Sequence, residues 1–211
     1  SLVAEIRALV EDHGELFADG GAPLPRLHLD RHLWTPLLLA LRDDDTGVQI
    51  SPPGLEESEA KFLRDLADYW KRHHEAEGLR NLELFVLRNR PGSGVGFFRR
   101  SGFFPDFIVW LRAPDGATRV RFVEPHGMHH GGLAGNRDKI EAFLELERLN
   151  ESEEFRRERL DVGGYLVTSS KLEEIPDAFG QGLGWDDLAR EYRLLRQAGD
   201  YVRTILSAAP R

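Results

Sequence analysis

Cysteine is absent from the 211-residue chain, and methionine occurs once, at Met128. The absence of thiols excludes a disulfide scaffold, a thiolate zinc site, an iron–sulfur cluster and a cysteine nucleophile. Long apolar runs are also missing, because stretches such as residues 37–41 and 107–111 fall far below the roughly 18 residues that a membrane span needs. No signal peptide is recognisable, so we expect a cytoplasmic protein without a membrane partner.

The sequence begins with Ser1 and Leu2 and has no initiator methionine. We therefore expect it to be a piece of a longer polypeptide, whose other parts contribute to its function. A length of 211 residues is enough for one domain with its own hydrophobic core, or for one domain with a helical appendage.

Positive charge is in the minority, since 28 Lys and Arg residues face 36 Asp and Glu residues and leave a formal net charge of −8. This balance argues against a protein that coats nucleic acid by bulk electrostatics. The basic residues are nevertheless grouped, because residues 86–100 contain no acid and four arginines: Arg88, Arg90, Arg99 and Arg100. The pattern predicts a bipolar molecule with one basic segment.

The spacing of apolar residues predicts an α/β fold. The expected helices lie at residues 1–19, 55–74, 137–149 and 185–206. The expected strands lie at residues 82–87, 103–111, 119–124 and 165–168, with a tight turn at 114–116 between the second and the third. This order of elements predicts a mixed central sheet flanked by helices, with a crossover before the last strand.

Two regions are expected along the chain. Residues 1–50 are expected to form an N-terminal helical or irregular layer, in which Pro36 suits an early turn of a helix over the apolar run at 33–41. The signal Ser-Pro-Pro-Gly at 51–54 marks a loop after this layer. Residues 51–211 are then expected to form the core, which ends in a helix.

One acid lies on the apolar side of the helix expected at 55–74. The apolar stripe of this helix contains Phe62 and Leu66, and Glu59 lies three residues before Phe62, so it projects from the middle of the stripe. A carboxylate on the core side needs a partner, because burying it unpaired is costly. The alternative is an exposed acid at the start of the helix, where the helix dipole favours negative charge.

Two further acids lie at the ends of predicted strands. Asp106 lies in the hydrophobic segment 103–111, and Glu124 ends the segment 119–124. If these strands pair through the turn at 114–116, the two carboxylates fall side by side at one edge of the sheet. They repel each other unless a cation or a shared proton lies between them. Few carboxylates, a backbone carbonyl, waters and a phosphate oxygen make a typical magnesium site, so we expect Mg²⁺ or Mn²⁺ here.

The motif Pro105-Asp106, followed after 17 intervening residues by Glu124-Pro125-His126, resembles the PD-(D/E)xK nuclease signature, with histidine at the position of the usual lysine. Neighbouring segments resemble one branch of this family, the C-terminal nuclease-like domain of DEAD/DEAH helicases related to the restriction subunit of type III restriction enzymes. The resemblance spans roughly residues 27–145, and its segments are 29–37, 58–62, 87–89, 94–98 and 102–107.

The resemblance implies a restriction-endonuclease-like core and a metal-dependent DNA endonuclease of the restriction or phage-defence type. It also implies an N-terminal helicase/ATPase region in the same polypeptide. Asp106, Glu124 and the carbonyl of Pro125 would hold Mg²⁺ or Mn²⁺, and Glu59 would help directly or through water. Because a nuclease with one site per chain ordinarily needs two copies to cut both strands, a homodimer is a further expectation.

Histidine at position 126 alters the chemistry that the signature implies. The family lysine supplies positive charge near the reacting phosphate, and His126 does so only when protonated, with an ordinary histidine pKa of about 6.5. It could instead accept a proton from the attacking water or bind the metal. Lys139, in the next helix, could supply the charge, but it lies about 100° from the apolar stripe around Ile140, so we expect it to be solvated.

The basic segment at 86–100 is expected to contact the phosphates of DNA. Its glycine-rich loop is flexible enough to approach a nucleic-acid backbone, with Arg88, Arg90, Arg99 and Arg100 at its ends. A solvated basic hairpin is the alternative. For the whole chain, two other interpretations remain: a module that binds nucleic acid without cutting it, and a structural or protein-docking domain.

Overall fold

The computed structural model describes residues 26–27, 37–38, 55–76, 78–89, 94–96, 102–128 and 131–207. The expected helix at 1–19 and most of the expected N-terminal layer lie outside these residues. The four described residues before position 55 form two short strands, β1 (Arg26–Leu27) and β2 (Leu37–Leu38), which pair antiparallel. A helical turn was expected from the apolar run at 33–41, and residues 37–38 of that run are extended instead because they pair with β1.

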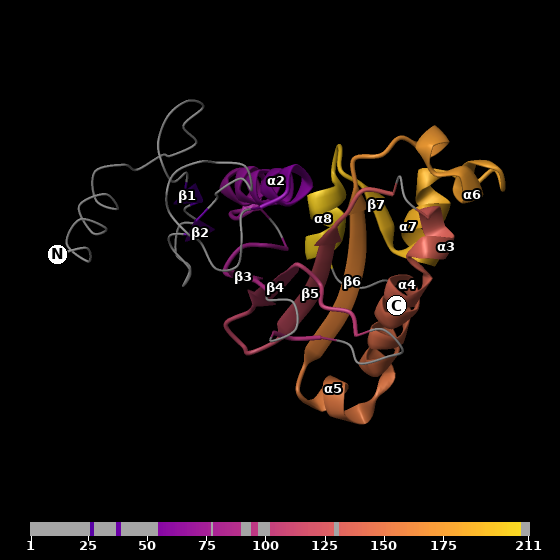
Figure 1. Cartoon of the computed structure of the whole chain (residues 1–211). Coiled ribbons are helices and arrows are strands. Elements are labelled where there is room, and N and C mark those ends of the chain that lie inside the picture. Colours follow the sequence, from indigo (N-terminus) through magenta and orange to yellow (C-terminus); the bar gives the residue numbers. More distant parts are fainter. Residues whose placement is uncertain are drawn as a thin grey trace.

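The predicted mixed sheet is present and has five strands in the order β3-β4-β5-β6-β7 (Figure 1). The first three strands pair antiparallel, and the last three pair parallel, so a crossover connects β5 to β6. The strands are β3 (Glu83–Arg88), β4 (Phe107–Arg112), β5 (Thr118–Pro125), β6 (Leu160–Thr168) and β7 (Leu194–Arg196).

The hairpin between β4 and β5 has the predicted tight turn. The Gly116 N–H donates to the Ala113 carbonyl at 2.9 Å, and the Ala113 N–H donates to the Ala117 carbonyl at 2.8 Å. Gly116 has a φ of +86°, in the region that glycine adopts without strain. The register set by this turn pairs Phe107 with Val123, so the residue before β4 and the residue after Val123 are neighbours.

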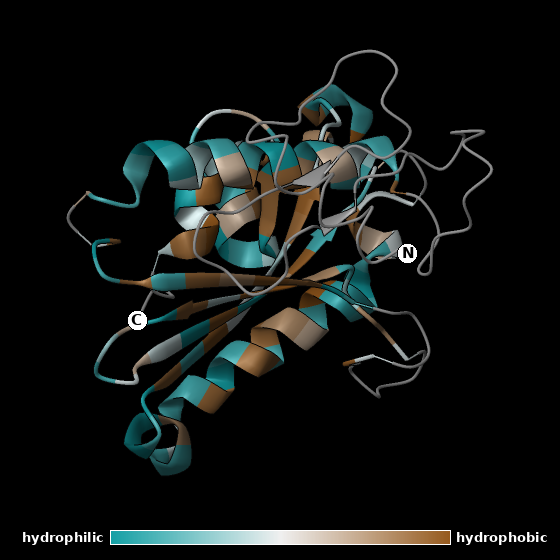
Figure 2. Cartoon of the chain, turned by 90° about the vertical axis from the view of Figure 1, so that its left-hand side faces the viewer, coloured by the Kyte–Doolittle hydropathy of each residue, from teal (hydrophilic) through white to brown (hydrophobic). Residues whose placement is uncertain are grey.

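Helices cover both faces of the sheet. Helices α2 and α8 lie on one face, and α4 and α7 lie on the other (Figure 1). In Figure 2, the strands of the sheet are largely hydrophobic, and the helices that flank it carry both hydrophobic and hydrophilic residues. No helix in the described ranges is long and apolar enough to cross a membrane. The helices are α2 (Glu57–His73), α3 (Gly132–Gly135), α4 (Arg137–Arg148), α5 (Glu153–Arg157), α6 (Pro176–Phe179), α7 (Trp185–Tyr192) and α8 (Tyr201–Leu206).

The amphipathic stripe predicted for α2 packs on the sheet. Phe62, Leu63 and Leu66 are fully buried, and the ring of Phe62 lies 5.3 Å from the ring of Phe107, between centroids. Burial of side chains of this size is the main favourable contribution to folding, at about 1.5–3 kcal/mol each. Helix α2 therefore has a fixed position over β4 and β5, with its first turn near the ends of these strands.

On the opposite face, α4 packs closely against β6 at a pair of glycines. A Cβ atom at Gly164 would overlap the ring of the buried Phe143, whereas one at Gly163 would make only ordinary contacts, the nearest at 3.6 Å. Glycine at position 164 is therefore what allows the helix to approach the strand so closely. The glycine pair also interrupts the apolar pattern, and only residues 165–168 of β6 were predicted as a strand.

The prediction of a single C-terminal helix at residues 185–206 is wrong. Helix α7 ends at Tyr192, and Arg193 then has a φ of +53°, which ends the helix. Residues 194–196 form β7, in which Leu194 is fully buried and pairs in register with Leu166 of β6. As a strand, this segment forms hydrogen bonds with the backbone N–H and C=O groups at the edge of β6. These hydrogen bonds favour the strand over the helix that the sequence pattern of the segment predicts.

Candidate active site

Two carboxylates meet at the ends of β4 and β5, as the hairpin register requires. The backbone N–H of Asp106 donates to Oε2 of Glu124 at 3.1 Å. The Glu124 side chain is 8% exposed, so this carboxylate is largely removed from water. The two acids that the sequence motif singles out are therefore direct neighbours in the fold.

Burial raises the pKa of Asp106 to about 9, and the negative charges of Glu124 and Glu59 add to the effect. Two carboxylates at such short range favour a state in which one proton is held between them. The charge of Lys139 acts in the opposite direction on the pKa of Asp106. With its pKa raised in this way, we expect the Asp106 carboxyl group to keep its proton at neutral pH.

Lys139 is part of this group of charges, and the expectation that it is solvated is wrong. Its Nζ lies 2.6 Å from Oε1 of Glu124, and its side chain is 25% exposed. The first turn of α4 lies over the end of β5, and the four methylene groups of the lysine carry the ammonium group back toward the sheet. The same ammonium group lies 5.4 Å from the centroid of the Phe103 ring, a cation–π distance.

Glu59 lies at the start of a helix, as one alternative from the sequence predicts, and it is also largely buried with a partner, as the other predicts. It is the third residue of α2 and accepts a hydrogen bond from the backbone N–H of Glu56 at 2.9 Å, so it caps the helix start. Its side chain is nevertheless only 12% exposed, and its Oε2 lies 3.6 Å from a guanidinium nitrogen of Arg88. Burial raises the pKa of Glu59, and the Glu56 hydrogen bond and the Arg88 charge partly offset this increase.

Arg88 lies beside the acids, although the sequence analysis assigned it to DNA phosphates. Its side chain is 14% exposed and is paired with Glu59. Burial lowers the pKa of Arg88, while the charges of Glu59 and Asp106 raise it. Arg88 therefore balances the acidic group in this state of the protein. The other predicted phosphate contacts, Arg90, Arg99 and Arg100, lie outside the described residues.

Pro125 and His126 follow Glu124 and leave the sheet. The Pro125 carbonyl accepts a hydrogen bond from the Ser58 hydroxyl at 3.3 Å, which ties the end of β5 to the first turn of α2. The His126 backbone N–H donates to the Val167 carbonyl at 2.7 Å, and His126 as a whole is exposed. The ammonium group of Lys139 contacts Glu124 at 2.6 Å.

Two side chains that the sequence analysis did not single out hold this region together. Asn89 is buried and donates to the carbonyls of Val95 and Pro105, at 2.7 Å and 2.8 Å. It thereby connects the end of β3 to Val95 and to the residue before Asp106. Gln197 is also buried and donates to the Ser58 carbonyl at 2.8 Å. An asparagine between a strand and a Pro-Gly loop is a typical turn residue, which is a signal for Asn89.

The described residues contain no group of three or more His, Asp or Glu side chains placed so as to hold a metal ion. The pair of Asp106 and Glu124 remains as a candidate. Mg²⁺ is usually held by one or two carboxylates, completed by waters and substrate phosphates. The two acidic side chains are hard oxygen donors of this kind.

The neighbouring charges are arranged in a definite order, from Lys139 through Glu124 and Asp106 to Glu59 and Arg88. Cations therefore lie at both ends of this row, and the three acids lie between them.

In comparisons with known proteins, no family model, no curated protein and no solved structure matches the chain.

Proposed function

We propose that the chain is a metal-dependent DNA endonuclease domain that hydrolyses phosphodiester bonds on a restriction-endonuclease-like core. The observation that supports this function best is the adjacency of Asp106 and Glu124, with Lys139 bound to Glu124. The spacing of these two acids in the sequence is that of the PD-(D/E)xK signature. The proposed context is a cytoplasmic helicase–nuclease of the restriction or phage-defence type.

Asp106 and Glu124 are the residues that would hold Mg²⁺ or Mn²⁺, with the Pro125 carbonyl and Glu59 as further donors. When bound, the ion would polarise a phosphate oxygen and lower the pKa of a bound water. The chain itself holds the two carboxylates next to each other in a largely buried place. In the proposed site the cation would replace the proton that the raised pKa of Asp106 favours at neutral pH.

Lys139 supplies the positive charge in this proposal, instead of His126. Its ammonium group lies against Glu124 at 2.6 Å, and a fixed positive charge at this point stabilises negative charge that develops on a phosphate. Cleavage should therefore not depend on the protonation of His126.

The nuclease proposal is tested by incubating plasmid DNA with the protein and Mg²⁺ or Mn²⁺. Asp106→Asn should abolish metal-dependent cutting, because it removes one of two anionic metal donors. Asp115→Asn is the matched control, since Asp115 is an exposed acid in the turn at the other end of β4. Cutting by the Asp106→Asn protein at the wild-type rate would overturn the proposal.

The role of Lys139 is tested by comparing Lys139→Gln with His126→Gln. We expect Lys139→Gln to lower the cleavage rate by about 100-fold or more, on the scale of losing one electrostatic donor, and His126→Gln to leave it nearly unchanged. Lys71→Gln, at an exposed lysine near the end of α2, controls for the loss of charge. If cleavage falls above pH 7 and is lost in His126→Gln, then His126, and not Lys139, supplies the positive charge near the phosphate.

A nucleic-acid-binding module that no longer cuts is the second candidate function. It is favoured by the lack of a three-ligand metal group in the described residues and by the two cations already paired with Glu124 and Glu59. DNA binding by both wild type and Asp106→Asn, without cleavage under any metal, would select it. The N-terminal helicase region and a second copy of the chain are proposed partners of either function.

A further inference from the structure

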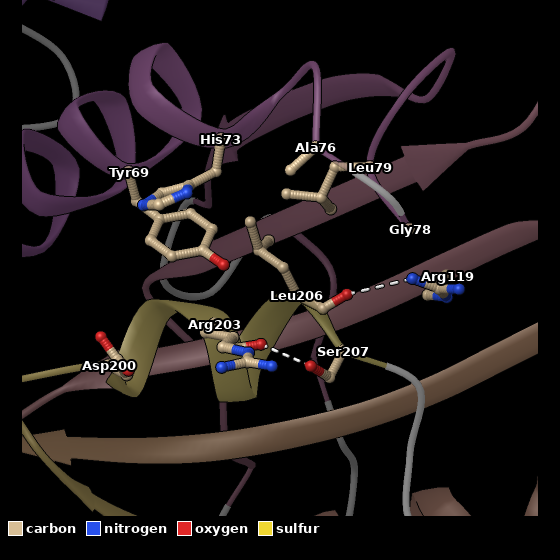
Figure 3. A pocket seen from close by; sticks show the side chains of 10 residues that line it. All are labelled: Tyr69, His73, Ala76, Gly78, Leu79, Arg119, Asp200, Arg203, Leu206 and Ser207. Atoms are coloured by element: carbon tan, nitrogen blue, oxygen red, sulfur yellow. Dashed lines mark hydrogen bonds between the residues drawn. The ribbon is translucent and has the colours of Figure 1, made fainter.

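A pocket of about 400 Å³ lies at the opposite end of β5 from the acidic pair (Figure 3). It is formed where the end of α2, the turn after it, the start of β5 and helix α8 meet. Arg119 lies on its border and is five residues before Glu124 in β5, a separation of about 17 Å along an extended strand. The pocket is therefore distinct from the candidate active site.

Two arginines give this pocket a positive character. Arg203 of α8 is exposed, and its guanidinium group has no hydrogen bond or ion pair within the described residues. Arg119 donates one hydrogen bond, to the Leu206 carbonyl at 3.2 Å, which leaves most of its N–H groups available. In a chain with a net charge of −8, these two groups are local candidates for binding an anion, since guanidinium groups match the geometry of phosphate.

The wall formed by α2 is aromatic. The rings of Tyr69 and His73 lie 4.4 Å apart, between centroids, and both line the pocket from above α8 (Figure 3). Leu79 and Leu206 add apolar surface. Flat aromatic and apolar walls accommodate the ring of a nucleobase, which stacks on aromatic side chains without a sequence preference.

Two further features fit a small ligand. Gly78 has a φ of +89°, and a Cβ atom there would have no neighbour within 4 Å, so the border at this turn is open. Asp200 is the acid of the lining, and its carboxylate can accept a hydrogen bond from a sugar hydroxyl or a base amino group. A volume of about 400 Å³ lies in the usual range of small-molecule sites.

We propose that this pocket binds a phosphorylated nucleoside, with the phosphate on Arg119 and Arg203 and the base against Tyr69 and His73. The ligand is either a free mononucleotide or the phosphorylated end of a nucleic-acid strand. This proposal does not depend on the nuclease function, because no residue of the acidic pair contributes to the pocket.

The test is calorimetric titration of the whole chain with dAMP, inorganic phosphate, deoxyadenosine, and an oligonucleotide with or without a 5′-phosphate. We expect saturable binding of the phosphorylated nucleosides and an affinity about tenfold lower for Arg203→Ala, as for the loss of one charge-assisted contact. Arg156→Ala, at an exposed arginine of α5, is the matched control. Asp106→Asn should bind like the wild type.

The comparison of ligands identifies the source of the phosphate. Tighter binding of dAMP assigns the pocket to a free nucleotide, and tighter binding of the 5′-phosphorylated oligonucleotide assigns it to a strand end. The proposal is overturned if no phosphorylated nucleoside binds saturably, if inorganic phosphate binds as tightly as dAMP, or if Arg203→Ala binds like the wild type. Loss of binding in Asp106→Asn with normal binding in Arg203→Ala would place the ligand at the acidic pair and overturn the proposal as well.

Discussion

At the scale of single residues, burial decides how the acids of the candidate active site behave. Asp106 and Asp115 lie at opposite ends of one hairpin, yet their carboxyl groups differ sharply. Burial raises the pKa of Asp106 to about 9, whereas the backbone N–H of Ala117 holds the pKa of the exposed Asp115 below its usual value. The carboxyl group of Asp106 therefore favours its protonated form, whereas that of Asp115 favours its ionised form.

The raised pKa of Asp106 has a consequence for stability that can be measured without any activity. Because the folded protein binds this proton more tightly than the unfolded chain, the stabilisation is complete below pH 4 and is lost as the pH rises toward about 9. Without metal, we expect Asp106→Asn to stabilise the protein at pH 9 by on the order of 1–3 kcal/mol relative to the wild type.

Urea unfolding in EDTA between pH 6 and pH 9 measures this effect. The free energy of unfolding of the wild type should fall more steeply with pH than that of Asp106→Asn. The control Asp115→Asn should keep the wild-type slope in this range, because the pKa of Asp115 is lowered and its titration lies below pH 6. Equal slopes for wild type and Asp106→Asn would show that the acidic pair does not hold the proton.

At the scale of elements, close packing between α4 and β6 sets the position of Lys139. The ring of Phe143 fills the space above Gly164, so α4 lies close to the sheet. Asn136 is buried just before α4 and donates to the Gly132 carbonyl at 2.9 Å, which holds the start of the helix. The lysine in the first turn is therefore within reach of Glu124.

Substitution of the two adjacent glycines of β6 tests this packing. We expect Gly164→Ala to destabilise the fold by on the order of 2 kcal/mol, because its methyl group would overlap the ring of Phe143. Gly163→Ala is the matched control and should cost less, since its methyl group would meet its nearest atoms at 3.6 Å. Thermal unfolding of both variants measures the difference, and similar melting temperatures would contradict the close approach of α4.

At the scale of the whole molecule, β5 separates two polar regions. Its end carries Glu124, which lies beside Asp106 just before the start of β4, and its start contributes Arg119 to the basic pocket. Between them, Arg121 is fully buried and pairs with Asp161 at 2.8 Å, and it also donates to the Ile205 carbonyl at 3.1 Å. This buried arginine joins β5 to β6 and to α8, between the two polar regions.

A metal that binds only the folded protein should stabilise the whole molecule. We expect Mn²⁺ to raise the melting temperature of the wild type at pH 8, because in the proposed site it would bind the carboxylates of Asp106 and Glu124. Asp106→Asn should show no such increase, and Asp115→Asn should show the wild-type increase. An equal response to Mn²⁺ in wild type and Asp106→Asn would place the metal elsewhere.

Local pattern predicted much of this fold. The helical stripe of α2, the turn at Gly116 and the adjacency of Asp106 and Glu124 all depend on residues close in sequence or on a two-stranded register. Periodicity and turn chemistry report such features directly. The α/β class with a mixed sheet follows from the order of these elements.

Only the tertiary structure decided the role of Lys139, the ion pair of Arg88 with Glu59, and the strand at residues 194–196. Each depends on which distant segment lies opposite, and a sequence pattern contains no information on that distance. Lys139 lies off the apolar stripe of its own helix, but its side chain is long enough to reach Glu124 once α4 packs on the sheet. Leu194 lies in a segment whose pattern predicted a helix. The open edge of β6 instead forms backbone hydrogen bonds with this segment, so its N–H and C=O groups are satisfied without water.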